Sequence, residues 1–413
     1  MKSMLRARPM RSGSEIEGHR PISDLHPLLH RVYLGREIVN FEEIELGLDN
    51  LLSPTELLGL DKASDLLCSA LKMQSRVLIV ADFDADGATS CVLAIRALRS
   101  FGFNSVDYIV PNRFEFGYGL TPEIVEMAKS RHPDLIITVD NGISSVDGVD
   151  VARASGIQTL ITDHHLAGQV LPRADVIVNP NQPGCRFKSK ALAGVGVIFY
   201  LMLGVRRALR ERDYFKKTEI PEPRLSELLD LVALGTVADV VPLDRNNRIL
   251  VDEGIKRIRV GRSRPGIYSL LKLAGKDPAN IVASDLGFYV GPRLNAAGRL
   301  DDMTTGIECL LADDEPTSYS FAGQLDAMNT ERKTIEAKMK EEAFSVVETL
   351  TLDGESLPAG ICLFDPNWHQ GVVGLVASRV KDKWHRPTIA FAFADASRDD
   401  KELKGSARSI GGI

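Results

Sequence analysis

Acidic and imidazole side chains follow the apolar segments of this chain at four places. They are Asp82, Asp84 and Asp86; Asp140; Asp163, His164 and His165; and Asp239. Several carboxylates that converge in one place repel each other, and they stay ionised together only where cations neutralise them. Oxygen and imidazole donors without a thiolate suit Mn²⁺ or Mg²⁺ better than structural zinc.

Two such ions, about 3.5–4 Å apart, can activate a water and stabilise the leaving oxygen of a phosphoester. Each motif alone is ambiguous: acidic loops are common, Asp140-Asn141-Gly142 reads as a turn, and neighbouring histidines often lie on the surface. Their joint occurrence after apolar runs favours a two-metal phosphoesterase site.

Short, β-branched apolar runs alternate with amphipathic segments from residue 77 onward. The runs are 77–80, 106–110, 135–139, 159–162 and 175–179. Each is nearly continuous, as expected for a strand that is buried on both faces. Helical segments are expected at about 89–100 and from Thr121-Pro122 onward. This alternation predicts an α/β fold with a doubly wound parallel sheet.

The functional crevice of an open parallel sheet lies beyond the carboxyl ends of its strands. Three of the acidic motifs follow predicted strands, so we expect them to meet there. Asp239 follows another apolar run, within the segment 231–243.

Four parts are expected along the 413 residues. A helical lead-in occupies 1–75, with helical spacing at 54–73, and a catalytic domain follows at 76–315. It is helix-rich at 187–275 and mixed to 315. A long charged helix at 316–350 then leads to a smaller α/β domain at 351–413, with strands around GICLF and TIAFAF and one helix between them.

The composition indicates a globular protein without a membrane span. Hydrophobic residues make up 44% and charged residues 26%, and no apolar run reaches the roughly 18 residues of a membrane helix. The net charge of −6 argues against a binder that uses its whole surface for nucleic acid, but leaves room for a local basic groove. Five separated cysteines without CxxC pairs indicate reduced thiols in a cytoplasmic protein.

Ten motifs, in order, resemble those of the DHH phosphoesterase superfamily, and of its single-strand-specific 5′→3′ exonuclease branch. They are DFDADG (82–87), PNRFEFGYGL (111–120), VDNG (139–142), TDHH (162–165), NPNQPG (179–184), LAGVGV (192–197), GTVADVVPL (235–243), GPRLNAAGRL (291–300), HQGVVGLVASRV (369–380) and KGSARSI (404–410). The resemblance covers about residues 50–410. It implies a metal-dependent exonuclease that degrades single-stranded DNA to mononucleotides in recombination and repair.

The resemblance also implies roles for individual residues. Two divalent ions, Mn²⁺ by preference or Mg²⁺, would be held by Asp84, Asp86, Asp140, His164 and Asp239. Asp140 would bridge them, and Asp82 would be a ligand or support one. His165 would act beside the scissile phosphate as electrostatic support or general acid, with Asp140 and Asp163 in the catalytic set.

Basic and polar residues in the matching motifs are implied to hold the 5′-phosphate and the DNA backbone. They are Arg113, Arg293, Asn295, Arg299, His369, Ser406 and Arg408. A guanidinium binds phosphate bidentately, which suits the arginines to this role, although Arg293 and Arg299 could equally be ion-paired structural residues. Phe114, Phe116 and Tyr118 could stack on bases or pack in the core.

The chain departs from its relatives at two points. No metal-binding side chain precedes the acidic run, where Ile79, Val80 and Ala81 stand. The chain ends before the glycine- and histidine-containing motif and the oligonucleotide-binding barrel of its relatives, so we expect an incomplete second domain. Single-strand binding protein and a repair helicase are the implied partners. Two alternatives remain: a phosphodiesterase for short oligonucleotides or cyclic dinucleotides, and an inactive binding module.

Overall fold

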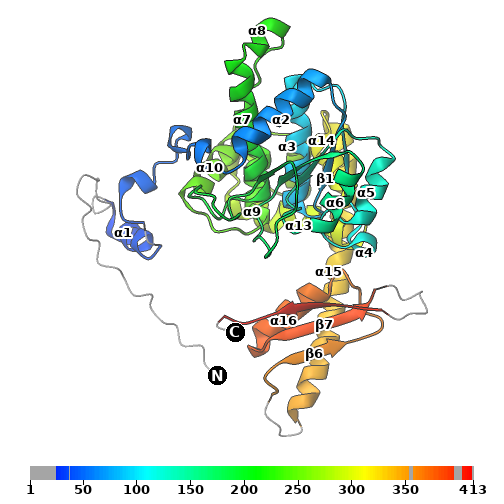
Figure 1. The fold of residues 1–413 in the computed structure, drawn as a ribbon. Coiled ribbons are helices and arrows are strands. Elements are labelled where there is room, and N and C mark those ends of the chain that lie inside the picture. The colour runs from blue at the N-terminus through cyan, green and yellow to red at the C-terminus, as the bar shows by residue number, and fades with distance from the viewer. Residues whose placement is uncertain (1–24, 37, 353–356, 395–401, 412–413) are drawn as a thin grey trace.

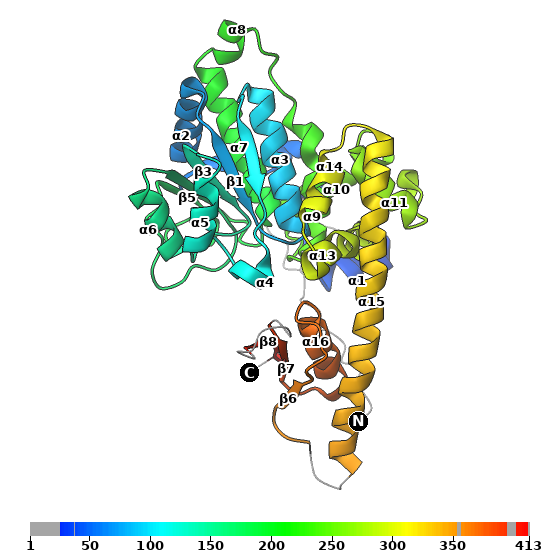
Figure 2. The same ribbon diagram turned by 90° about the vertical axis from the view of Figure 1, so that its right-hand side faces the viewer.

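The computed structural model describes residues 25–36, 38–352, 357–394 and 402–411. The first 24 residues of the expected lead-in therefore lie outside it. Figure 1 shows a large lobe, built from α2 to α14, and a small lobe, built from β6 to β8 and α16. Helix α15 (Glu315–Leu352) runs along the large lobe and on into the small one, as Figure 2 shows.

The large lobe contains a five-stranded parallel sheet of order β2-β1-β3-β4-β5. Its strands are β1 (Val77–Ala81), β2 (Val106–Ile109), β3 (Leu135–Val139), β4 (Gln158–Thr162) and β5 (Val176–Val178). All five expected strands are confirmed. The strand order reverses between β1 and β3, which is where ligands bind in doubly wound sheets.

Helices cover both faces of this sheet, and alternate strand residues point to each. Ile79 and Ile137 join the core under α2 (Leu60–Met73), α3 (Ala85–Phe101) and α7 (Gly194–Glu211). Val80 and Ile136 join a second core, under α5 (Pro122–Lys129) and α6 (Val146–Ala154). The expected doubly wound α/β fold is confirmed, and the two-sided burial explains why each strand is a continuous apolar run.

The rest of the large lobe is helical. Its further helices are α4 (Arg113–Phe116), α8 (Tyr214–Thr218), α9 (Leu229–Ala238), α10 (Arg245–Arg259), α11 (Pro265–Leu273), α12 (Ala283–Asp285), α13 (Gly291–Leu300), α14 (Thr304–Leu311) and a π-helix, η7 (Leu286–Val290). Helix α1 (Pro27–Leu34) precedes the lobe in the chain and has no buried residues. Short 3₁₀ turns lie at η2 (Phe41–Glu43), η3 (Leu48–Asn50), η4 (Pro54–Glu56), η5 (Leu225–Leu228) and η6 (Pro278–Asn280). The segment expected to be mixed, before residue 315, is thus mostly helical.

Two helix starts differ from the expected ones, each for a local reason. Helix α2 begins at Leu60 rather than near Pro54, because Gly59 has a left-handed φ of +88° that interrupts the helical path. Helix α3 begins at Ala85 rather than near Thr89, because the Asp84 side chain caps it by accepting hydrogen bonds from the backbone N–H groups of Asp86 and Gly87.

The small lobe is a three-stranded sheet packed on α16 (Val373–Trp384) and the C-terminal half of α15. Strand β6 (Ile361–Phe364) pairs in parallel with β7 (Thr388–Phe393), as their apolar runs predicted. The sequence did not predict the third strand, β8 (Leu403–Arg408), which pairs antiparallel with β7 and carries polar side chains. Among the described residues, no helix combines the length and apolar character that a membrane span needs.

Helix α13 brings the acidic run of β1 close to the small lobe. A side chain at Gly298 would place its Cβ 1.8 Å from the backbone oxygen of Phe83, and one at Gly371 would place it 2.1 Å from that of Arg299. The Lys404 ammonium of β8 also donates a 2.6 Å hydrogen bond to the Phe114 carbonyl. The lobes therefore meet beside residues 82–86.

We expect Gly298→Ala to lower the free energy of unfolding by about 1–3 kcal/mol, because the added methyl group must push α13 away from Phe83. Gly323→Ala is the matched control: it lies within helix α15 with nothing within 4 Å of its Cβ position. It should raise stability by about 0.5–1 kcal/mol. Urea denaturation followed by circular dichroism compares them, and equal effects would contradict the close approach.

Candidate metal centre

The acidic run after β1 is shaped by the first turn of α3. The Asp84 carboxylate accepts from the backbone N–H groups of Asp86 (2.9 Å) and Gly87 (3.0 Å). The Asp86 carboxylate in turn accepts from Gly194 N (2.7 Å) and Val195 N (2.9 Å), at the N-terminus of α7. Two helix N-termini thus offset part of the negative charge of this run.

Asp140 at the end of β3 is buried, with only 1% of its surface exposed, and has a φ of +62°. The next residue, Asn141, donates its side-chain amide to the carbonyls of Val80 (3.1 Å) and Val139 (2.9 Å). These bonds hold the ends of β1 and β3 together, so the carboxylates of both strands face one space.

The two histidines after β4 lie in different environments. His164 lies inward, whereas His165 is partly exposed and is held through Asp163. One oxygen of Asp163 accepts from the His165 ring (2.7 Å) and from the backbone N–H of His164 (2.7 Å), and the other accepts from Ile143 N (2.9 Å). Asp163 is therefore saturated by protein donors, and its position suits support of His165 rather than a metal.

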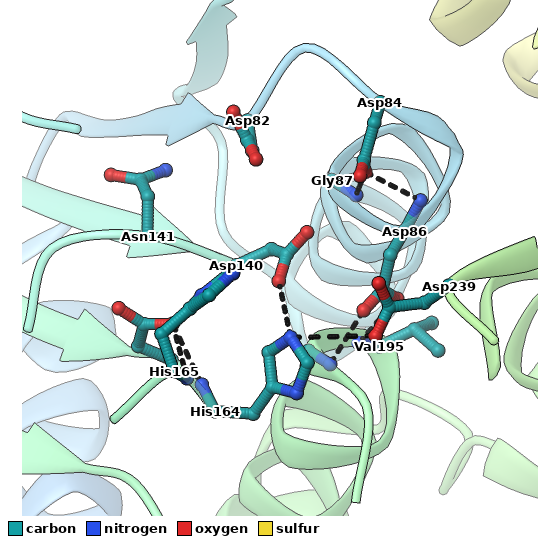
Figure 3. A network of polar contacts seen from close by, with 12 residues as sticks. Asp82, Asp84, Asp86, Gly87, Asp140, Asn141, His164, His165, Val195 and Asp239 are labelled. Atoms are coloured by element: carbon teal, nitrogen blue, oxygen red, sulfur yellow. Dashed lines mark hydrogen bonds and ion pairs between the residues drawn. The ribbon is translucent and has the colours of Figure 1, made fainter. Parts of the chain in front are cut away.

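The four motifs converge around His164, as Figure 3 shows. Its Nε2 atom lies 3.2 Å from Asp140 Oδ1 and 3.5 Å from Asp239 Oδ2. Three groups of side chains offer ligand atoms within 4.8 Å of one another: Asp82, Asp84 and Asp140; Asp86, His164 and Asp239; and Asp140, His164 and His165. All six sequence-derived metal ligands are thus brought together.

Two atoms of this cluster lack the hydrogen-bond partners that buried polar atoms need, and a metal ion would satisfy both. Asp140 Oδ1 and His164 Nε2 are both buried and have no hydrogen-bond partner in the described residues, even though they lie 3.2 Å apart. A buried acceptor without a donor is costly unless a cation takes the place of the donor. The residues present therefore fit divalent ions.

The electrostatics support the same conclusion. Burial, together with the neighbouring carboxylates, raises the pKa of Asp86 and of Asp140 well above the usual range, and that of Asp239 to about 6. Burial lowers the pKa of His164 to about 4, so the imidazole is neutral at pH 7 and can act as a ligand. Cations would reverse the shifts of the carboxylates, because they stabilise the ionised forms.

His165 has the opposite character. Its hydrogen bond to Asp163 raises its pKa to about 9, so it is charged at neutral pH. Burial raises the pKa of Asp163, but its hydrogen bond and attraction to His165 outweigh this and leave it below the usual value. The Tyr118 hydroxyl lies 3.2 Å from His165 Nδ1 and donates to the Asp140 carbonyl (3.2 Å). Tyr118 therefore lines the site. The sequence alone left open whether it stacks on bases or packs in the core.

Asp239 differs from the other candidate ligands in the element that carries it. It is the C-terminal cap of helix α9, not the end of a strand, and Val240 follows it with a φ of +63°. A branched residue in this left-handed region costs roughly 1–2 kcal/mol. Glycine usually stands at this position after a helix. The strained turn fixes the place where Asp239 leaves the helix.

The residues expected to bind substrate do not all lie together. Arg299, Ser406 and Arg408 line one cavity of about 380 Å³, here called the end pocket, at the N-terminus of α16. Arg293 does not line this cavity. It is 9% exposed and donates to Asp326 Oδ1 and to the Tyr289 carbonyl. These contacts favour an ion-paired structural residue over a phosphate contact. The side chain of Arg113 lies outside the described residues.

Asn295 and His369 hold backbone segments in place. Asn295 Oδ1 accepts from Ala85 N (2.7 Å), next to the acidic run. His369 Nδ1 accepts from Gly371 N (3.1 Å), and burial lowers its pKa. Both therefore position the loops around the site in this structure.

Some residues that build the site lie in matched motifs but were not among the predicted site residues. Asn179 and Asn181 donate to the backbone carbonyls of His165 (3.0 Å) and His164 (2.6 Å), and Lys404 joins the end pocket. The segments 179–184 and 192–197 matched family motifs, but their hydrogen bonds depend on the folded backbone. Only the motif match could have drawn attention to them.

Known proteins resemble this chain closely. Residues 76–236 match the model of the DHH family, N-terminal domain. The single-stranded-DNA-specific exonuclease RecJ of Escherichia coli strain K12 is 52% identical over 391 residues, which cover 95% of this chain and 67% of the relative. That of Haemophilus influenzae is 50% identical over 415 residues, covering 100% of this chain and 70% of the relative.

Solved structures agree. A crystal structure of exonuclease RecJ bound to manganese matches with a TM-score of 0.71 and 32% identity, over 88% of this chain and 85% of that one. RecJ from Thermus thermophilus in complex with Mg²⁺ matches with a TM-score of 0.66 and 29% identity, over 92% and 48% of the two chains.

We expect Asp140→Asn to raise the stability of the metal-free protein by on the order of 1 kcal/mol, because it removes one of several buried carboxylates. Asparagine also tolerates the left-handed backbone there. The same change should abolish the stabilisation by Mn²⁺, which for an intact site is about 2.7 kcal/mol at 100 times Kd. Thermal denaturation with and without Mn²⁺ measures both effects.

The matched control is Asp150→Asn, which removes the carboxylate on α6 that pairs with Arg173. It should keep the full Mn²⁺ effect. An undiminished Mn²⁺ shift in Asp140→Asn would show that the cluster is not the metal centre.

Proposed function

The chain belongs to the RecJ family, and on this premise we propose how its residues hydrolyse single-stranded DNA. It is a metal-dependent, single-stranded-DNA-specific exonuclease, a hydrolase of the DHH superfamily. Its cofactors are divalent ions, Mn²⁺ or Mg²⁺. The observation that carries this function is the intact Asp and His cluster in a chain 52% identical to a RecJ over 95% of its length.

Two groups of side chains would hold the ions. One ion would be held by Asp82, Asp84 and Asp140, and the other by Asp86, His164 and Asp239. Asp140 could serve both groups, because its Oδ1 also lies 3.2 Å from His164 Nε2. When bound, the ions would supply an activated water and neutralise charge on the phosphodiester.

His165 is the group of the chain that faces the reacting phosphate. Its side chain is 44% exposed, Asp163 fixes its ring, and its raised pKa keeps it protonated. A charged imidazole in this position donates to a phosphate oxygen and can pass a proton to the leaving oxygen. We therefore assign to His165 the stabilisation of the leaving oxygen, the 3′-oxygen of the released nucleotide.

The end pocket explains why cleavage starts at a 5′ end. Arg299 and Arg408 can pair with a terminal phosphate, the Ser406 hydroxyl can donate to it, and the first backbone N–H groups of α16 lie beside it. A phosphate held there, next to the metal centre, sets the scissile bond one nucleotide inward. This geometry supports the release of mononucleotides in the 5′→3′ direction.

The alternative functions have less support. The high-identity relatives and the RecJ structures favour the exonuclease over a phosphodiesterase for short or cyclic dinucleotides. The convergence of all six predicted ligands argues against an inactive module. We further propose a cytoplasmic role in recombination and repair, with single-strand binding protein and a repair helicase as partners, on the strength of the family alone.

The activity is tested on 5′-phosphorylated single- and double-stranded oligonucleotides with Mn²⁺. We expect only the single strand to be shortened, from its 5′ end. His165→Gln should lower kcat by about 100- to 10,000-fold, the range of general acid catalysis, and keep the Mn²⁺ effect on thermal stability. Equal digestion of both substrates would contradict the function, and an unchanged kcat would contradict the role of His165.

The end pocket predicts a preference for 5′-phosphorylated over 5′-hydroxyl strands. Arg408→Gln should lower kcat/KM on the phosphorylated strand by about tenfold or more, since a charge-assisted hydrogen bond is worth about 1.5–3 kcal/mol. It should leave the 5′-hydroxyl strand nearly unaffected. Arg386→Gln changes a half-buried arginine elsewhere in the small lobe, which donates to the Pro358 carbonyl (3.1 Å), and is the control. Equal losses on both strands would place the phosphate elsewhere.

A further inference from the structure

The side chains of one candidate metal group, Asp86, His164 and Asp239, come from three separate segments of the chain (Figure 3). Asp86 lies in the first turn of α3, His164 follows β4, and Asp239 caps α9. Ligand atoms must lie within about 0.2 Å of their preferred distances from a metal ion. Contacts between the three segments must therefore hold these side chains in place.

The segment 190–195, which leads into α7, contacts two of these ligands. Asn181 donates its side-chain amide both to the His164 carbonyl (2.6 Å) and to the first carbonyl of this segment (3.1 Å). At the other end of the segment, two backbone N–H groups donate to the Asp86 carboxylate (2.7 and 2.9 Å). The segment therefore ties the backbone of His164 to the side chain of Asp86.

Asn247, in the first turn of α10, supplies the link to Asp239. It is fully buried, and its Nδ2 donates to the carbonyls of Ala191 (2.7 Å) and Pro242 (3.0 Å). Ala191 belongs to the segment 190–195, and Pro242 lies in the turn that follows Asp239. One amide thus joins the segment that contacts two ligands to the turn that carries the third.

The turn after Asp239 exposes two of its apolar side chains instead of burying them. Val240 is 83% exposed and Leu243 is 41% exposed. Asp244 ends the turn and caps α10, where its carboxylate accepts from the backbone N–H of Asn247 (2.9 Å). Asn247 therefore binds this turn twice, once through its backbone and once through its side chain.

The side chain of Asn247 serves only as a donor. Its Oδ1 is buried and has no hydrogen-bond partner in the described part of the chain. The cost of an unpaired buried acceptor points to a role of the two donors other than stability. The preceding Asn246, 3% exposed, has the opposite pattern: its Oδ1 accepts from Leu52 N (3.1 Å) and from the Tyr200 hydroxyl (2.9 Å). Two neighbouring asparagines thus bind different parts of the protein.

We propose that Asn247 is a positioning residue for the metal group of Asp86, His164 and Asp239. It sets the distance between Asp239 and the other two ligands, and with it the affinity of this group for its ion. It acts through the backbone of the ligand segments and not on the ion itself. This inference rests on the proposed function, which supplies the two metal groups. Residues that orient metal ligands change metal affinity by about 10- to 100-fold when they are replaced.

The test is a titration of the metal-free protein with Mn²⁺, followed by isothermal titration calorimetry. Asn247→Ala should raise the Kd of one of the two ions about 10- to 100-fold. It should leave the other Kd unchanged, because the other metal group follows β1 and β3 and does not depend on the turn after α9. Asn246→Ala is the matched control: it removes a similarly buried amide from the same helix and should change neither Kd. Both variants should lower the melting temperature of the metal-free protein.

Hydrolysis of 5′-phosphorylated oligo(dT) gives a second readout. In Asn247→Ala, the Mn²⁺ concentration for the half-maximal rate should rise by the same factor as the Kd. Excess Mn²⁺ should restore most of kcat, with an unchanged KM for the oligonucleotide. Asn247→Ser keeps one donor and serves if the alanine variant does not fold; it should give a smaller rise of the same Kd.

Three results would overturn the role of Asn247: equal losses of Mn²⁺ affinity in the two alanine variants, equal weakening of both ions in Asn247→Ala, and no change of either Kd in Asn247→Ala. The first would mean that the residue is only structural. A wild-type protein that binds two ions but leaves single strands intact would contradict the proposed function instead. The titration would still decide the role of Asn247, because it requires no turnover.

Discussion

The mutual repulsion of buried carboxylates at the ends of β1 and β3 is the constraint on which the rest of the structure depends. Asp86 and Asp140 have no more than 1% of their surface exposed, and Asp239 caps a helix within reach of the same imidazole. Without cations such a cluster opposes folding. The fold can place these groups together because α3 and α7 aim backbone N–H groups at Asp84 and Asp86, and because the strand order reverses where β1 and β3 end.

The two histidines show how one short motif yields two different groups. Burial keeps His164 neutral and leaves its Nε2 free of protein donors, as a ligand requires. One residue later, the carboxylate of Asp163 keeps His165 charged. The two successive side chains leave the backbone in different directions (Figure 3), and Asn179 and Asn181 fix the backbone of both. The chemistry of the site thus depends on backbone contacts as much as on the ionisable groups.

The sequence revealed the parts of this site that follow from local rules. Apolar runs located all five strands of the large sheet, and the carboxyl-end rule brought Asp82, Asp140 and His164 together. It could not show that Asp239 ends a helix, since an apolar run of that length suits either element. Nor could it separate Arg293 from Arg299, which share one motif: the ion pair with Asp326 and the cavity beside Arg408 arise only when distant segments pack. Strand β8 was not predicted, because it contains no apolar run and only its pairing with β7 makes it a strand.

Helix α13 explains why the second lobe matters to the chemistry of the first. Its glycine at 298 lets it lie against the backbone of Phe83, and its Asn295 binds the first N–H of α3. The same helix presents Arg299 to the end pocket, and Arg299 donates to the Gly371 carbonyl of the small lobe. A shift of the small lobe therefore moves Ser406 and Arg408, the groups that we propose to bind phosphate, relative to the acidic run. The position of this helix between the two lobes is set by backbone contacts that leave no room for a side chain at Gly298 or at Gly371.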